Sequence, residues 1–195
     1  RHEFLSEEID FFVTLAGQAA IAIENARLYN AIRRQLQELT ALNAIAAICA
    51  GATDEDALLE HATRVIGEVF RADEFGVMLL AEREAGSVLW VHPSYRASEE
   101  AKARAVPIPI AQGITGRVAA TGRPWRLADV SREPQYLAFY PETRSELCVP
   151  LKVGERVIGV INAESALPDA FSESDERLLM TCAGQLATAL ERLRT

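Results

Sequence analysis

The sequence predicts an α+β fold in which terminal helices cover one face of an antiparallel sheet. Helical patterns stand at both ends of the chain, and short extended segments fill the middle. The clearest strand pair is 146–152 with 156–164, because Gly154 and Glu155 between them suit a two-residue type II′ turn. Ser172 and Asp175 have the spacing that caps the final helix. Helices before and after such a sheet would pack on one of its faces.

Periodicity, glycine and proline place the remaining elements. A long helix is expected from Ser6 to Cys49, with Gly51 as its left-handed C-cap. A second helix, capped by Thr53 or Asp54, is expected over 55–70. Between the helices we expect strands at 75–81 and 88–95, a short helix at 98–105, extended chain at 106–110, a short helix at 113–120, a strand at 125–127 and an irregular stretch at 130–143.

Composition excludes several classes of partner. The 195 residues carry a formal net charge of -8, and no stripe of Lys and Arg is present, so neither nucleic acid nor an anionic membrane surface is expected as a partner. No segment approaches the roughly 20 apolar residues of a membrane span, and the N-terminus has no signal-peptide pattern. The three cysteines lack metal-ligand spacing and favour a reducing cytoplasm.

A repeat suggests how the chain is organised. Residues 14–27 return as 181–194, with eight of the fourteen positions identical. The repeat includes Gly17 and Gly184, and glycine inside a helix costs about 1 kcal/mol, so a close packing contact is expected there. We expect 1–28 to be the last helix of a preceding domain, 29–50 a connecting helix, and 51–195 one complete domain. Chance convergence of two alanine-rich helices is the alternative.

The connecting helix also shows heptad spacing. One seam position holds Tyr29, Leu36 and Asn43, and the other holds Ile32, Leu39 and Ala46. We therefore expect a homodimer formed through the helix over 20–50 and the C-terminal helix. A helix that packs only against its own domain is the alternative.

Three segments carry a family resemblance. The segment 144–165, Arg-Ser-Glu-Leu-Cys-Val-Pro-Leu-Lys-Val-Gly-Glu-Arg-Val-Ile-Gly-Val-Ile-Asn-Ala-Glu-Ser, resembles the hallmark hairpin of GAF domains. The segments 113–122 and 171–175 are similar to the short helix and to the start of the last helix in that family. The resemblance covers about 36–195, and 4–30 resemble the closing helix alone.

The resemblance implies a sheet of about six strands, with the terminal helices behind it. In front, short helices and loops would roof a pocket for a small molecule. Such domains commonly occur in tandem in sensor histidine kinases and other signalling proteins. We therefore expect a cytoplasmic sensory domain of a signal-transduction or two-component protein, covalently linked to an output domain and not itself an enzyme.

Strand alternation assigns the two faces of the hairpin. The apolar face, expected against the helices, comprises Leu147, Val149, Leu151, Val157, Gly159 and Ile161. The mixed face comprises Glu146, Cys148, Pro150, Ile158, Val160, Asn162 and Glu164. Of these we take Glu146, Cys148, Asn162 and Glu164 as candidate ligand-binding residues, with a solvated strand face as the alternative.

Other candidates follow from the fold that the resemblance implies. Met78 and Leu80 would face the pocket, and Trp90 and His92 alternate together and could join them. The aromatics of the irregular stretch, Tyr136 and Phe139, would form the roof. For all four ring-bearing residues, ordinary packing or a surface position is the alternative.

Specific ligands can be weighed against these residues. The stretch 130–143 lacks the cysteine that bilin-binding relatives use, so no covalent bilin is expected, and only His92 could serve a haem, which is not expected either. An unidentified small molecule is the expected ligand. The alternatives are a ligand-free dimerisation and relay module, or an enzyme like the free methionine sulfoxide reductases of this fold. That enzyme needs clustered thiols, and Cys49, Cys148 and Cys182 are expected to lie apart.

Overall fold

The computed structural model describes residues 5–84, 86–99, 102, 106–138 and 140–195. They divide into two units, Arg1–Thr40 and Ala41–Thr195, which are described separately. The elements are α1 (Ser6–Gly51), α2 (Glu55–Phe70), β1 (Glu74–Ala81), β2 (Val88–Val91), β3 (Ile108–Pro109), α4 (Gly113–Thr121), β4 (Trp125–Leu127), a 3-10 turn (Val130–Arg132), β5 (Ser145–Val153), β6 (Arg156–Ser165) and α5 (Glu173–Arg194). The short helix expected over 98–105 falls largely outside the described residues.

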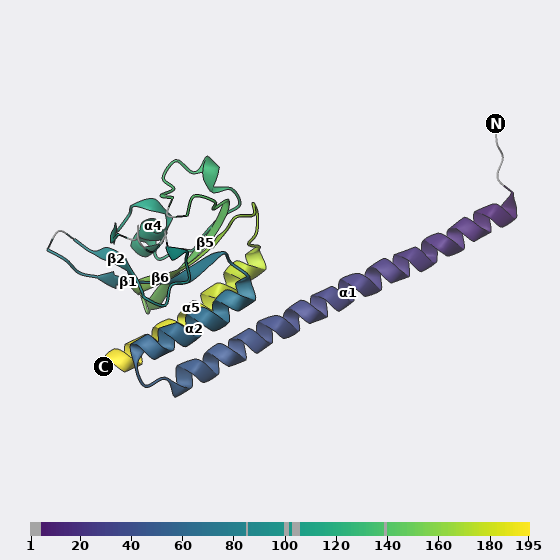
Figure 1. The fold of residues 1–195 in the computed structure, drawn as a ribbon. Helices are drawn as coiled ribbons and strands as arrows, with labels where there is room; N and C mark the ends of the chain where they lie inside the picture. The colour runs from purple at the N-terminus through teal and green to yellow at the C-terminus, as the bar shows by residue number, and fades with distance from the viewer. Residues whose placement is uncertain (1–4, 85, 100–101, 103–105, 139) are drawn as a thin grey trace. The chain divides into compact units, whose positions relative to one another are not determined.

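Six antiparallel strands form one sheet in the order β3-β2-β1-β6-β5-β4. The long strands β1, β6 and β5 are central, and the short strands β3 and β4 are its edges. Helices α2 and α5 lie on one face, and α4 lies on the other (Figure 1). The α+β fold predicted from the sequence is therefore confirmed.

The β5–β6 hairpin turns as predicted but contains a bulge. Gly154 has φ 59°, the left-handed value that the first turn residue of a type II′ turn needs. The register then shifts between Leu151 and Lys152. As a result Ile158 joins the helix-side core, and Val157 packs with the opposite cluster. The expected faces of these two residues were wrong, because one extra residue in a strand reverses the alternation beyond it.

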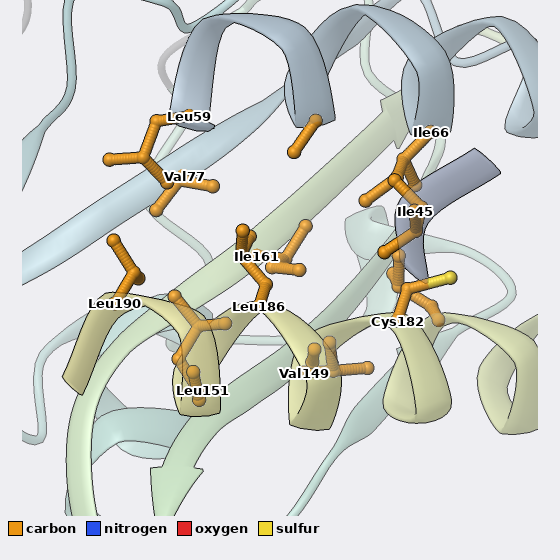
Figure 2. Close-up of a cluster of buried hydrophobic side chains, with 14 of the residues drawn as sticks. Ile45, Leu59, Ile66, Val77, Val149, Leu151, Ile161, Cys182, Leu186 and Leu190 are labelled. Carbon is orange, nitrogen blue, oxygen red and sulfur yellow. The ribbon is translucent and has the colours of Figure 1, made fainter. Parts of the chain in front are cut away.

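The main core lies between the sheet and helices α2 and α5. Figure 2 shows Val149, Leu151 and Ile161 of the sheet packed against Leu186 and Leu190 of α5. Leu59 and Ile66 of α2 complete this layer, and Leu59 is fully buried. The capping box at Ser172 and Asp175 fixes where α5 begins, because Ser172 Oγ accepts the amide of Asp175 and the carboxylate accepts the amide of Ser172.

Two glycine expectations are corrected. Gly51 is the last residue of α1 and is not among the residues with positive φ, so it is no left-handed cap. A Cβ placed on Gly184 would meet no atom within 4 Å, and the same is true of Gly17. The close packing expected at both repeated glycines is therefore absent from the described structure. No described helix is both long enough and apolar enough to cross a bilayer.

Candidate functional site

Three carboxylates stand side by side on the face of the sheet away from α2 and α5. Glu164 on β6 is the Cα partner of Glu74 on β1 and of Glu146 on β5. Direct partners in a sheet point to the same side. Each of the three residues is only 3 % exposed. Strand pairing has therefore brought together three acidic groups from distant parts of the sequence. Glu74 and Glu164 are 90 residues apart in the chain.

Glu164 is held by a set of neutral donors. Thr143 Oγ1 donates to its Oε2 at 2.6 Å, and the Tyr136 hydroxyl donates to the same oxygen at 3.4 Å. Asn162 Nδ2 donates to the other oxygen, Oε1, at 2.9 Å. These bonds fix the orientation of the carboxylate without neutralising its charge.

Asn162 has one side-chain atom without a hydrogen-bond partner among the described residues. Its Nδ2 also donates to the Tyr95 hydroxyl at 3.3 Å, so the amide N–H groups have partners. Its Oδ1 is buried and has no hydrogen-bond partner among the described residues. A buried acceptor without a donor is costly, at about 1–3 kcal/mol, and calls for an explanation such as an absent ligand or water.

Burial raises the pKa of each of these acids. The pKa of Glu146 lies well above its usual value, because the group is desolvated and because Glu164 is close. Desolvation raises the pKa of Glu164 to about 7, with Glu74 adding to the shift and the bonds from Thr143, Tyr136 and Asn162 opposing it. Desolvation also raises the pKa of Glu74. None of the ion pairs in the described part of the chain joins a Lys or Arg to any of the three.

Cys148 lies one row further along the same face. It is the Cα partner of Asn162 and of Trp125, and it is fully buried. Desolvation, followed by the negative charges of Glu146 and Glu164, raises the pKa of its thiol well above the usual value. The thiolate form that reacts with electrophiles is therefore scarce near neutral pH.

The other two thiols belong to the helix-side core. Cys49 and Cys182 are both free and lie in the same buried cluster, where Cys49 contributes to the raised pKa of Cys182 after desolvation. The expectation that all three cysteines lie apart was wrong for this pair. It holds for Cys148, which packs in the cluster on the other side of the sheet.

The predicted site residues divide into two groups. Glu146, Cys148, Asn162 and Glu164 share one face, Met78 and Leu80 pack in the apolar cluster of that face, and Tyr136 reaches Glu164. Phe139 lies outside the described residues. Trp90 and His92 do not join the group.

The reason is the register of β1 with β2. Met78 pairs with Val91 and Leu80 with Leu89, so these two β2 residues face the site and Trp90 faces the other side. Trp90 is 41 % exposed, with the Arg83 guanidinium 5.0 Å from its ring centroid. His92 instead bonds Ser94 through Nδ1 at 2.8 Å and Asp56 of α2 through Nε2 at 3.2 Å.

Sequence reasoning missed three members of the cluster. Glu74 points to the same side of the strand as Met78. A predicted strand that began at 74 and not at 75 would have included Glu74 among the candidates. Tyr95 and Thr143 lie outside the regular strands, and only the folded chain brings their hydroxyls to Asn162 and Glu164. No group of His, Cys, Asp or Glu in the described ranges could hold a metal ion.

Comparison with known proteins assigns the family. A GAF domain family model matches residues 52–191, which is more than half of the chain. The chain therefore belongs to the GAF domain family, as its sheet, flanking helices and hairpin indicate.

The curated relatives include protein YtsP, a free methionine-R-sulfoxide reductase and a nitrogen fixation protein. The chain is 33 % identical over 85 residues to protein YtsP of Bacillus subtilis, covering 44 % of this chain and 52 % of that protein. It is 30 % identical over 91 residues to the free methionine-R-sulfoxide reductase of Escherichia coli, covering 47 % and 55 %. It is 30 % identical over 128 residues to the nitrogen fixation protein VnfA of Azotobacter vinelandii, covering 60 % and 24 %. The chain thus spans about half the length of the first two.

The similar solved structures also include both a reductase and a GAF domain of another protein. The free methionine-R-sulfoxide reductase of Neisseria meningitidis, in complex with its substrate, superposes with a TM-score of 0.72 at 28 % identity, covering 80 % of this chain and 90 % of that one. The GAF domain of an Acinetobacter phosphoenolpyruvate-protein phosphotransferase has a TM-score of 0.67 at 21 % identity, covering 80 % and 93 %, and shows the fold alone.

These similarities correct one expectation. The chain was expected not to be an enzyme, and the reductases were given as the less favoured alternative. The similarity to reductases from Escherichia coli and Neisseria meningitidis contradicts that expectation, and a reductase is at least as well supported as a sensor.

Proposed function

We propose that this GAF domain binds a small ligand with a protonated amine on the polar face of its sheet. The observation that carries the proposal is the orphaned Oδ1 of Asn162, buried beside Glu146 and Glu164. An ammonium group offers three donors and one positive charge. It would satisfy the amide oxygen and supply the cation that the acidic cluster lacks among the described residues.

Free methionine-R-sulfoxide is the ligand that we propose. Two similar proteins are reductases of this compound, and one was solved in complex with its substrate. The compound is a free amino acid, so its amine matches the acidic cluster. Apolar side chains of the same face, among them Met78, Ile114 and Val160, would contact its aliphatic part.

Reduction of this ligand is the candidate activity, and Cys148 is the thiol on the proposed binding face. Its sulfur would attack the sulfoxide sulfur, methionine would leave, and the oxygen would remain on Cys148 as a sulfenic acid. An external dithiol would then restore the thiol, with its own oxidation to a disulfide and release of water. Since burial raises the pKa of Cys148, such turnover should become faster as the pH rises.

The second candidate is a sensory role for the same site. The long α1 helix favours it. Binding without turnover would then bias the connecting helix, which requires a difference in ligand affinity between two helix arrangements. The heptad seam and homodimer expected from the sequence belong to this proposal and stay predictions.

Isothermal titration calorimetry tests the binding step. Free methionine-R-sulfoxide should give saturable heat, and the N-acetylated compound, which lacks the amine, should give none. Glu164→Gln should weaken binding by about tenfold or more, because a hydrogen bond between charged groups contributes about 1.5–3 kcal/mol. Glu155→Gln is the matched control, since the Glu155 side chain is fully exposed in the hairpin turn. Equal binding of the N-acetylated compound would contradict the proposal.

Turnover in the presence of a dithiol separates the two candidates. Methionine release that is lost in Cys148→Ser, with binding retained, supports the reductase. Binding without release supports the sensor. Release that survives in Cys148→Ser would place the reducing thiol elsewhere and would overturn the role proposed for Cys148.

A further inference from the structure

The amino-terminal unit exposes large apolar side chains along α1. Phe11 is 64 % exposed, Phe12 57 %, Leu15 51 % and Ile23 54 %. Leu5, Ile9, Val13 and Ile21 of the same stretch are also at least half exposed. At somewhat under 100 Å² each, the eight side chains present roughly 600–800 Å², at or above the ~300–600 Å² patch of a typical monomer. A helix that is apolar on several sides is normally buried.

The repeat within the sequence identifies what covers such a helix. The alignment that pairs Thr14 with Thr181 also pairs every buried residue of α5 with an apolar residue of α1. The buried residues of α5 are Leu178, Leu179, Cys182, Ala183, Leu186, Ala187, Ala189 and Leu190. Their counterparts are Phe11, Phe12, Leu15, Ala16, Ala19, Ala20, Ala22 and Ile23.

Part of the outward side of the two helices agrees as well, although Ile21 stands at the counterpart of the exposed Thr188. Thr181 and Gly184 of α5 are exposed, and Thr14 and Gly17 are identical to them. Glu191 and Arg194, near the end of α5, are also repeated, as Glu24 and Arg27. The repeat therefore preserves the pattern of a helix that packs one side on a sheet, and its identical outward residues go beyond the apolar pattern that any two amphipathic helices share.

We propose that residues 5–28 are the closing helix of a second GAF-type domain of the same polypeptide. The sheet of that domain would cover Phe11, Phe12, Leu15 and Ile23 as the sheet of this domain covers α5. Its neighbouring helix would cover part of the remaining apolar surface, as α2 does beside α5. The cover is thus an antiparallel sheet with an apolar face of branched side chains.

Hydrogen exchange tests the proposal on the protein produced with the native coding sequence before residue 1. Amides of 5–28 should exchange as slowly as those of α5, and they should exchange much faster in the 195-residue chain. A coding sequence without such a domain, or fast exchange of 5–28 in the longer protein, would overturn the proposal. The 195-residue chain could instead show slow exchange of 5–28 that becomes slower with concentration, together with a dimer by light scattering. That result would show that a second copy of the chain covers the helix, and it would also overturn the proposal.

A matched pair of variants in the longer protein distinguishes the covered side of the helix from the outward side. Leu15→Glu should speed exchange of 5–28 by at least about tenfold, because it places a charge where α5 has the buried Cys182. Thr14→Glu, at the counterpart of the exposed Thr181, should change exchange little. Should Leu15→Glu prevent folding, Leu15→Ala serves in its place. Equal effects at the two positions would contradict the proposed packing.

Discussion

Glu146 and Glu164 are Cα partners across β5 and β6, and each is only 3 % exposed. Two ionised carboxylates in direct cross-strand contact repel one another, and desolvation penalises both charges. The arrangement therefore costs stability at any pH that ionises both groups. Proteins retain such costs mainly where they serve binding or catalysis.

Glu164→Gln should stabilise the protein above neutral pH. The pKa of Glu164 is about 7 in the folded state, against about 4.5 without the fold, so the unfolded chain releases this proton first as the pH rises. The folded state consequently loses stability between pH 4.5 and 7, and the loss is complete above pH 7. Removing the charge should raise the free energy of unfolding by about 1–3 kcal/mol at pH 8 and by less at pH 5.5.

Urea unfolding at the two pH values measures this difference. Glu155→Gln is the control, because its side chain is exposed and its removal should change stability by less than about 0.5 kcal/mol. A destabilised Glu164→Gln at pH 8 would show that the Thr143 and Asn162 bonds outweigh the buried charge.

Ligand binding should be linked to protons. The ammonium group of the ligand needs ionised carboxylates, so the affinity for free methionine-R-sulfoxide should rise between pH 6 and 8 and level off above the pKa of Glu164. At pH 7 binding should release protons, and the measured heat should depend on the ionisation enthalpy of the buffer. Calorimetry in phosphate and in Tris tests this, and Glu164→Gln should reduce the buffer dependence.

Gly76→Ala should destabilise the fold and disturb the site together. A Cβ at Gly76 would lie 2.5 Å from the ring of Tyr95, whose hydroxyl accepts a hydrogen bond from Asn162. Overpacking of this kind costs about 1–3 kcal/mol. Gly184→Ala is the contrasting variant: it has open space and lies in α5, so it should stabilise by about 0.5–1 kcal/mol. Thermal unfolding and ligand titration of both variants test the pair.

The three thiols should be protected from alkylation in the native state. Cys148 is fully buried and Cys182 is 1 % exposed, while Cys49 is 9 % exposed, and desolvation raises the pKa of all three. Iodoacetamide labelling followed by mass spectrometry should therefore find Cys49 modified first, and all three only slowly below the unfolding transition. Rapid labelling of Cys148 would show instead that the site opens readily to solvent.

Much of the fold was readable from the sequence, because local patterns decide local structure. The hairpin turn follows from Gly154, whose positive φ is the value a type II′ turn needs. The start of α5 follows from the cap at Ser172 and Asp175. Alternation also placed Glu146, Cys148, Asn162 and Glu164 on one face, since the period of a strand is fixed at two residues.

Tertiary structure decided what lies beyond such local rules. The register of β1 with β2 faces Val91 and Leu89 to the site and turns Trp90 away, and register depends on packing that no short segment contains. The bulge at Leu151 and Lys152 reversed Val157 and Ile158 for a similar reason. Burial is also a property of the folded chain: the sequence shows two glutamates and an asparagine, and only the fold desolvates them together. It also leaves Asn162 Oδ1 without a donor among the described residues, and the proposed cation site rests on that observation.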